Sequence, residues 1–297
     1  AGSLAAASNG LGIWYLFGDE TTHDEGPNMQ QVPRHEQQTF LRMFSTLGGA
    51  YSLHTPEAVG AALRRGMCQV DDPHFAGPFF LLMPMNIQPA ALSGFHLDEL
   101  PIGPPPALGA ATSREAYDEA VALLREARRV VVKVGGGAAG CGQVLDEFLR
   151  LTDGVAVLSP KLTGALPYVH PRNLRVGGSK GTLCGNFAME TADLLVALGT
   201  RAVCQSDSSR TGYPAVRAVI NVNTDPAAAL HYSRTTALVG DVSATLEVLC
   251  SLLRLQGASD EPPASDWFRE CTAKRAEWEA FKAERYDRPT LHDEVWG

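Results

Sequence analysis

The sequence predicts an α/β protein in which parallel sheets are flanked by helices. Between residues 113 and 256, apolar segments of strand length alternate with segments of helical periodicity. Parallel strands that are covered by helices on both faces read as continuous apolar runs, so this alternation favours a parallel sheet. Two more apolar runs precede a proline-rich stretch at 86–114. At roughly 100–200 residues per domain, the length of 297 residues predicts two domains or one large one.

The first domain is expected over residues 1–93. Its Ala-rich start reads as the end of a helix that closes at Asn9-Gly10, because asparagine and glycine often end helices. A further helix is predicted from Thr55, a candidate N-cap, with Pro56 at its first position. The remaining elements are strands at 13–17 and 79–83 and a polar loop at 19–38.

The second domain is expected over residues 115–256, after a proline-rich linker at 94–114. Prolines keep a chain extended and semi-rigid, which suits a connection between domains. A tail at 257–297 is expected to contain an amphipathic helix at 265–285. The predicted strands are 130–134, 155–158, 193–198, 216–222 and 237–239, and helices are expected from Ser113, around 144–149 and at 242–253.

Composition and charge exclude several classes of function. The net charge of −8 argues against nonspecific nucleic-acid binding, which needs a basic surface. No apolar run approaches the roughly 18 residues of a membrane span. The six cysteines form no C-x-x-C pair, so reduced thiols in a cytoplasmic protein are expected. The first ten residues lack the basic region of a signal peptide, and the missing initiator methionine indicates a fragment or a processed chain.

The sharpest local motif is a glycine-rich turn from Gly135 to Gly140. It has the G-x-G-x-x-G spacing and lies between a predicted strand and a predicted helix, where a backbone can approach a pyrophosphate. Two interpretations stay open: a nucleotide contact, or a tight turn without a ligand. The next strand ends at Leu158, and Ser159, Pro160 and Lys161 follow it. It therefore lacks the carboxylate that binds a ribose in a standard NAD site.

A second motif, at residues 177–181, matches the G-x-S-x-G pattern of a serine nucleophile, with Ser179 at its centre. Asp225 and His231 follow in the chain order of a hydrolase. The preceding segment 174–176 is only a weak strand, however, so a tight loop at the edge of the sheet is the favoured interpretation.

No metal site is assigned from the sequence. The H-E-x-x-H pattern of zinc proteases is incomplete at His35, because Thr39 stands where the second histidine would be. The other histidines are scattered along the chain, and surface or loop positions are favoured for them.

In their order, the segments resemble the thiamine-diphosphate-dependent enzymes of the acetolactate synthase type. Residues 13–19 (IWYLFGD) are similar to a late strand of that family's pyrimidine-binding domain. Residues 28–31 (NMQQ) are similar to a loop whose glutamine faces the substrate, which would be Gln30. Residues 77–88 are similar to the strand that closes this domain, with Asn86 in place of the usual aspartate. Residues 1–93 would thus be the C-terminal part of a pyrimidine-binding-type α/β domain.

Residues 115–256 resemble the middle domain of the same family, which has a Rossmann-like fold. The matching segments are VVKVGGG, GGSKGT, ADLLVALGTR, VINVNTD and LVGD. The tract from GTR to LVGD is somewhat closer to the trihydroxycyclohexanedione hydrolases than to decarboxylases. Some members hold FAD or ADP in this domain and others leave it empty. The residues expected to contact such a nucleotide are Gly135, Gly136, Gly137, Ser179, Gly181, Thr200, Arg201, Asn223, Asp225 and Asp241.

The chain departs from the family at the groups that act on thiamine diphosphate. The family's catalytic glutamate lies upstream of residue 1, so no catalytic residue is assignable here. Its metal-binding Gly-Asp-Gly motif has no match at Asp19 or Asp241, and 289–297 is similar to the linker into the missing domain. The chain alone is therefore expected not to use thiamine diphosphate and magnesium productively. A complementary chain would supply the missing domains, and either that chain or a second copy in a homo-oligomer would cover an exposed strand edge.

The leading hypothesis is a part of a thiamine-diphosphate-dependent lyase, transferase or hydrolase. It would make or cleave C–C bonds of a small substrate, either a 2-keto acid or a cyclic 1,2-dione. One alternative is a non-catalytic module that binds FAD or ADP or serves in assembly. The other is an NAD-dependent oxidoreductase, which the missing ribose carboxylate disfavours.

Overall fold

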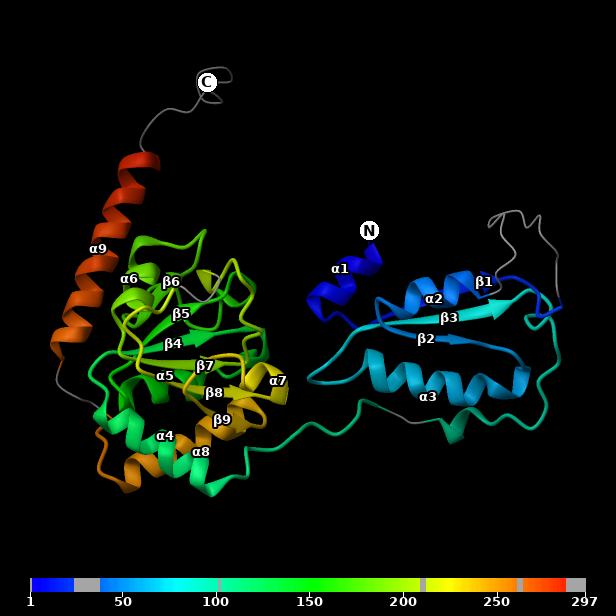
Figure 1. The fold of residues 1–297 in the computed structure, drawn as a ribbon, viewed down its shortest axis with the longest axis horizontal. Coiled ribbons are helices and arrows are strands. Elements are labelled where there is room, and N and C mark those ends of the chain that lie inside the picture. Colours follow the sequence, from blue (N-terminus) through cyan, green and yellow to red (C-terminus); the bar gives the residue numbers. More distant parts are fainter. Residues whose placement is uncertain (1, 24–37, 101–102, 209–211, 261–263, 287–297) are drawn as a thin grey trace, which may run out of the picture. The chain divides into compact units, whose positions relative to one another are not determined.

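A computed structural model describes residues 2–23, 38–100, 103–208, 212–260 and 264–286 (Figure 1). The chain divides into two compact units, 1–107 and 108–297. The division falls within the stretch 94–114 that the sequence predicts as a linker. In the described part of the chain, no helix is long and apolar enough to cross a membrane.

The first unit contains a three-stranded sheet in which both strand pairs are parallel. The predicted strands at 13–17 and 79–83 are confirmed, and β3 lies between the other two strands. β2 and α2 were not predicted, since β2 is only four residues long and its sequence GAYS is not strongly apolar. The elements are α1 (Gly2–Asn9), β1 (Ile13–Asp19), α2 (Thr39–Ser45), β2 (Gly49–Ser52), α3 (Val59–Val70) and β3 (Pro78–Pro84).

The helix predicted from Thr55 begins as a 3₁₀ turn at Pro56 that leads into α3 at Val59. Thr55 stands at the predicted N-cap position with the extended backbone usual there, but its side chain makes no capping hydrogen bond. Proline suits this place because its fixed φ matches a helix and no N–H is needed there.

The second unit is built on a six-stranded parallel sheet in the order β6-β5-β4-β7-β8-β9. In chain order this is 3-2-1-4-5-6, the order of the doubly wound dinucleotide-binding fold. The order reverses between β4 and β7, at the centre of the sheet. The strands are β4 (Val130–Val134), β5 (Val155–Leu158), β6 (Asn173–Val176), β7 (Leu194–Leu198), β8 (Ala218–Asn223) and β9 (Thr235–Val239).

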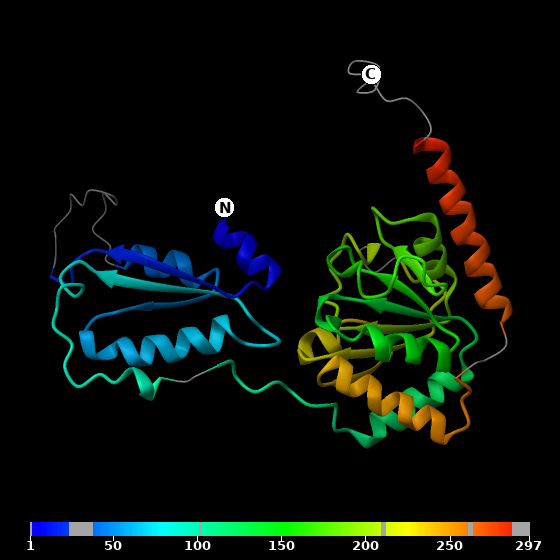
Figure 2. The same cartoon turned by 180° about the vertical axis from the view of Figure 1, so that it is seen from behind.

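Helices cover both faces of this sheet, which confirms the predicted fold class. In Figures 1 and 2, α4, α5 and α8 lie on one face, and α6 and α9 lie on the other. The helix predicted from Ser113 is confirmed as α4, and Ser113 caps it, since its hydroxyl accepts from the Ala116 N–H at 3.2 Å. The helices are α4 (Arg114–Glu126), α5 (Gly142–Leu151), α6 (Leu183–Thr191), the short α7 (Pro226–Ala229), α8 (Val242–Leu255) and α9 (Asp266–Tyr286).

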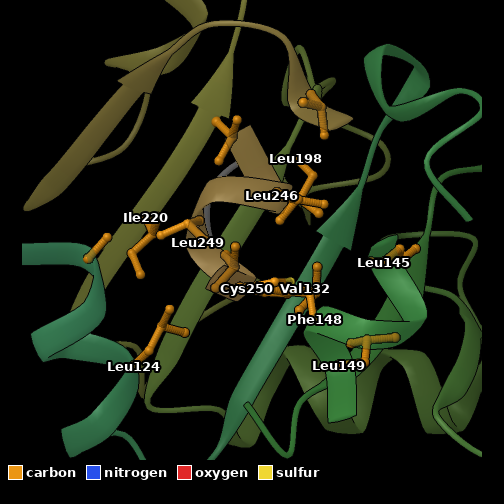
Figure 3. Close-up of a cluster of buried hydrophobic side chains, with 14 of the residues drawn as sticks. Leu124, Val132, Leu145, Phe148, Leu149, Leu198, Ile220, Leu246, Leu249 and Cys250 are labelled. Atoms are coloured by element: carbon orange, nitrogen blue, oxygen red, sulfur yellow. The ribbon is translucent and has the colours of Figure 1, made fainter. Parts of the chain in front are cut away.

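The side chains of β4 alternate between two cores, because successive residues of a strand point to opposite faces. Val132 joins Phe148 of α5 and Leu249 of α8 in the larger core (Figure 3). Val131 belongs to the core on the other face, together with Trp267 of α9. The Trp267 indole donates to the Val130 carbonyl at 3.2 Å, so α9 is attached at the first residue of the central strand β4.

Four buried cysteines make the stability of the fold depend on pH. Cys68 and Cys204 are exposed, whereas the other four thiols are buried. Burial raises the pKa of Cys141 to about 11 and that of Cys250 to about 12. The folded state therefore keeps protons that the unfolded state releases above its thiol pKa of about 9.

We expect the free energy of unfolding to fall as the pH rises from 8 to 10, by about 1–2 kcal/mol for each such thiol. Urea unfolding at the two pH values measures this fall. Cys250→Ala should reduce it, and Cys68→Ala, which removes an exposed thiol, serves as the control. Equal falls in the two variants would contradict the assignment.

Candidate functional site

The candidate site lies at the carboxyl edge of the six-stranded sheet, where the strand order reverses between β4 and β7. Doubly wound sheets bind their ligands at this point. The turns that follow the two strands are hydrogen-bonded to each other. The Gly135 N–H donates to the Leu198 carbonyl at 2.8 Å, and the Gly137 N–H donates to the Gly199 carbonyl at 2.9 Å.

Two of the three central glycines are required by this close approach. A Cβ atom at Gly135 would lie 2.5 Å from the Gly199 carbonyl oxygen, and one at Gly137 would lie 3.0 Å from the Gly199 Cα. Gly136 differs, because a Cβ there would meet nothing within 4 Å. Its backbone faces open space, so a ligand could approach the turn at this residue.

The neighbouring strand ends continue the edge. The Asn223 amide at the end of β8 donates to the Thr200 carbonyl at 2.9 Å, which joins the loops after β7 and β8. The Asp225 N–H donates to the Asn223 side chain at 3.2 Å. The Asp225 carboxylate accepts from the Ala227 N–H at 2.9 Å and so caps α7. These residues were expected to contact a nucleotide, and what the structure shows is that they hold the edge together.

Ser179 and Gly181 lie in the loop after β6. Ser179 connects this loop to the same edge through Gln205 of the segment after β7. Both the Ser179 N–H and its hydroxyl donate to the Gln205 carbonyl, at 2.8 and 3.1 Å. A Cβ at Gly181 would lie 2.7 Å from the backbone of Gly177, so this glycine serves a tight turn. With Ser179 bonded to Gln205 and Asp225 capping α7, two of the three residues of the serine-hydrolase hypothesis have structural roles.

The remaining expected residues are less central. Asp241 follows β9, caps α8 through the Ala244 N–H at 2.9 Å, and donates its own N–H to the Gly109 carbonyl. That end of the edge is covered by the chain at 109–111, since a Cβ at Gly240 would lie 2.4 Å from the Ala111 nitrogen. Arg201 is exposed in the loop after β7. Gln30 lies outside the described residues.

Sequence reasoning missed a buried polar cluster next to this edge. Lys133 of β4 and Asp207 of the loop after β7 are each only 1% exposed. The Lys133 ammonium donates to the Ser206 carbonyl at 2.9 Å, and the Tyr232 hydroxyl donates to Asp207 at 3.0 Å. A lysine inside an apolar strand was a visible signal for part of this cluster.

The described residues do not fit a metal-bound thiamine diphosphate. Among them, no group of three or more His, Cys, Asp or Glu side chains could hold a metal ion. Burial raises the pKa of Asp19 at the end of β1, and Asp241 is engaged as a helix cap. A standard NAD site also lacks its ribose carboxylate, because β5 ends at Leu158 and Ser159 follows.

A small cavity of about 160 Å³ opens at the carboxyl ends of the strands in the first unit. Its lining includes Asp19, Ser52 and His54. Asn86 stands where the resembling family has aspartate, and it makes two hydrogen bonds with Thr22. The Thr22 N–H donates to the Asn86 Oδ1 at 2.9 Å, and the Asn86 side-chain amide donates to the Thr22 hydroxyl at 2.7 Å. Asn86 thus holds the chain that follows β1.

The different surroundings of the glycines predict different effects of the same substitution. Gly135→Ala should lower the free energy of unfolding by about 1–3 kcal/mol, because the new methyl group meets backbone atoms that cannot move away. Gly136→Ala should change it by less than about 0.5 kcal/mol. Urea unfolding followed by circular dichroism compares the two. Equal losses would show that the turn is not packed as described.

Comparison with known proteins gives a consistent family. Residues 117–249 match the family described as thiamine pyrophosphate enzyme, central domain. Acetolactate synthase 1, chloroplastic, of Zea mays is 28% identical over 214 residues, which cover 68% of this chain and 32% of the maize protein. The acetolactate synthase isozyme 3 large subunit of Escherichia coli (strain K12) is 30% identical over 175 residues, 57% of this chain and 29% of that protein.

The acetolactate synthase of Mycobacterium avium is 31% identical over 153 residues, 50% of this chain and 25% of the relative. The chain thus spans about a third or less of the length of these relatives. The family match covers the six-stranded sheet up to α8, and the strand order of this sheet agrees with it. Residues 117–249, a little under half of the chain, thus match the central domain of the thiamine pyrophosphate enzymes.

Proposed function

We propose that this chain is part of an enzyme that uses thiamine diphosphate to make or cleave a C–C bond. The substrate would be a 2-keto acid or a cyclic 1,2-dione. The observation that carries the proposal is the central-domain match over residues 117–249, supported by relatives that are named acetolactate synthases. Thiamine diphosphate stabilises a substrate-derived carbanion when it is bound.

The groups that hold this cofactor would come from outside the described residues. The described part of the chain offers no cluster of metal ligands, and magnesium is needed to neutralise a pyrophosphate. A longer form of this protein or a complementary chain would supply these groups, and the assembly could also be a homo-oligomer. Within the described residues β1 is an edge strand of the three-stranded sheet, and an unpaired strand edge favours pairing with another chain.

The middle domain would hold an adenine nucleotide such as FAD or ADP at its carboxyl edge. The open space at Gly136 supports this proposal, together with the position of the edge at the reversal of strand order. The same observation supports the second candidate function, a nucleotide-binding or assembly module without catalysis. The two functions differ in whether the completed protein turns over with thiamine diphosphate.

Native mass spectrometry of the purified chain tests the first part of the proposal. With thiamine diphosphate and magnesium, we expect no adduct at the mass of this chain alone. When the chain is joined to, or mixed with, the missing domains, we expect thiamine-dependent turnover of a 2-keto acid or a cyclic dione. An adduct on the chain alone, or a completed protein that never requires thiamine diphosphate, would contradict the proposal.

The nucleotide proposal predicts a specific loss of binding at Gly136. Wild-type chain should bind FAD or ADP in isothermal titration calorimetry, and Gly136→Leu should weaken this binding at least tenfold because its side chain fills the open space. The matched control is Ala122→Leu, which introduces the same side chain at an exposed position of α4. Equal affinity in both variants would place the nucleotide elsewhere.

A further inference from the structure

The central strand of the middle domain carries a lysine that the proposed function does not use. Lys133 alternates with Val132 and Val134, which belong to the core beneath α5 and α8, so it shares the opposite face with Val131. It is 1% exposed, and β4 is paired on both sides, with β5 and β7. A charged group in such a place is unfavourable unless other groups compensate it.

The compensating groups come from one segment, residues 200–208, which follows β7. The Ser206 carbonyl accepts from the Lys133 ammonium at 2.9 Å, and Asp207 is the neighbouring buried carboxylate. Asp207 is held from a further element, because Tyr232, between α7 and β9, donates to its Oδ1 at 3.0 Å. The segment is thus held at two places, by Lys133 of β4 and by Tyr232 of the chain between α7 and β9.

The same segment joins the loops of the candidate site. The Gln205 carbonyl accepts from the N–H and the hydroxyl of Ser179, in the loop after β6. The Thr200 carbonyl accepts from Asn223 at the end of β8. Any shift of the segment would therefore move the edge formed by Thr200 and the glycine turn. Lys133 lies beneath the centre of this arrangement.

The cluster is poorly suited to stabilising the fold. Burial lowers the pKa of Lys133 to about 8 and raises that of Asp207, so desolvation outweighs their mutual attraction. The Tyr232 and Tyr213 hydroxyls, Lys133 and His231 all act to lower the pKa of Asp207, but burial outweighs them. Such a cluster adds little to stability, because the cost of burying the charges offsets what their partners return.

We propose that Lys133 and Asp207 are a positioning pair that fixes the 200–208 segment above the sheet. The pair determines where Thr200 and the loop after β6 lie, and it does so at a cost in stability. This inference concerns the position of the segment and holds whether or not a nucleotide binds. If the proposed nucleotide site is correct, the pair also sets the shape of that site.

The test distinguishes an effect on the position of the 200–208 segment from an effect on the stability of the fold. It removes the charges of Lys133 and Asp207 with side chains of similar size. In Lys133→Met/Asp207→Asn, the asparagine can still accept from Tyr232. We expect a urea midpoint equal to or above that of wild type, because no buried charge remains. Lys133→Met alone should give a lower midpoint than the double variant, because it leaves Asp207 buried without its partner.

Hydrogen exchange followed by mass spectrometry measures how firmly the 200–208 segment is held in place. The N–H groups of Ser206 and Asp207 donate to the Val203 carbonyl, and that of Ser179 donates to Gln205. In the double variant these amides should exchange at least tenfold faster than in wild type, while the amides of β7 and β8 keep their rates. The matched control is Val131→Ala, on the same face of the same strand. It should lower the urea midpoint without selective exchange in the segment.

The proposal is overturned if the double variant is folded and the segment exchanges as in wild type, or if Val131→Ala loosens the segment equally. Should the double variant fail to fold, Tyr232→Phe decides, because it removes only the hydroxyl that holds Asp207. It should accelerate exchange of the Asp207 amide about threefold, and an unchanged rate would overturn the proposal. Titration of the same variants with ADP tests the nucleotide site separately. If the wild-type chain binds no ADP, the proposed nucleotide site is contradicted, but the result of the exchange experiment still decides the proposal about Lys133 and Asp207.

Discussion

The middle domain depends on the contact between two backbone turns at the centre of its sheet. The turns after β4 and β7 approach so closely that only glycine fits at Gly135 and Gly199, where a Cβ atom would lie 2.5 Å from backbone of the opposite turn. This contact lets the two strands stay paired to their carboxyl ends. The segment after β7 also accepts hydrogen bonds from Asn223 at the end of β8 and from Ser179 in the loop after β6, so the site and the fold share one constraint.

Much of the fold could be predicted because the strands of a covered parallel sheet are apolar along their whole length, as β4, β5 and β7 are. The elements that were missed depend on tertiary contacts. β2 is a strand of sequence GAYS that exists by pairing with β3. α6 contains Gly185 and Asn186, which are weak helix formers, and its packing against α9 compensates for them.

The candidate site could be located from its glycine spacing, but the roles of its residues could not. Asp225 and Asp241 were expected to contact a ligand, and both cap helices. An aspartate between a strand and a helix suits either role, so sequence alone does not separate them. Lys133 was visible as a charge in an apolar run. Its acceptor Ser206 lies 73 residues later, and no spacing rule connects the two.

The distribution of thiols offers a direct way to observe this molecule in solution. Cys68 lies on α3 in the first unit and Cys204 lies on the 200–208 segment in the second, and both are exposed while the other four cysteines are buried. Alkylating dyes react with accessible thiolates, so each unit can carry one fluorophore without any substitution. Energy transfer between the two dyes would report the separation of the units as ligands or partner chains are added.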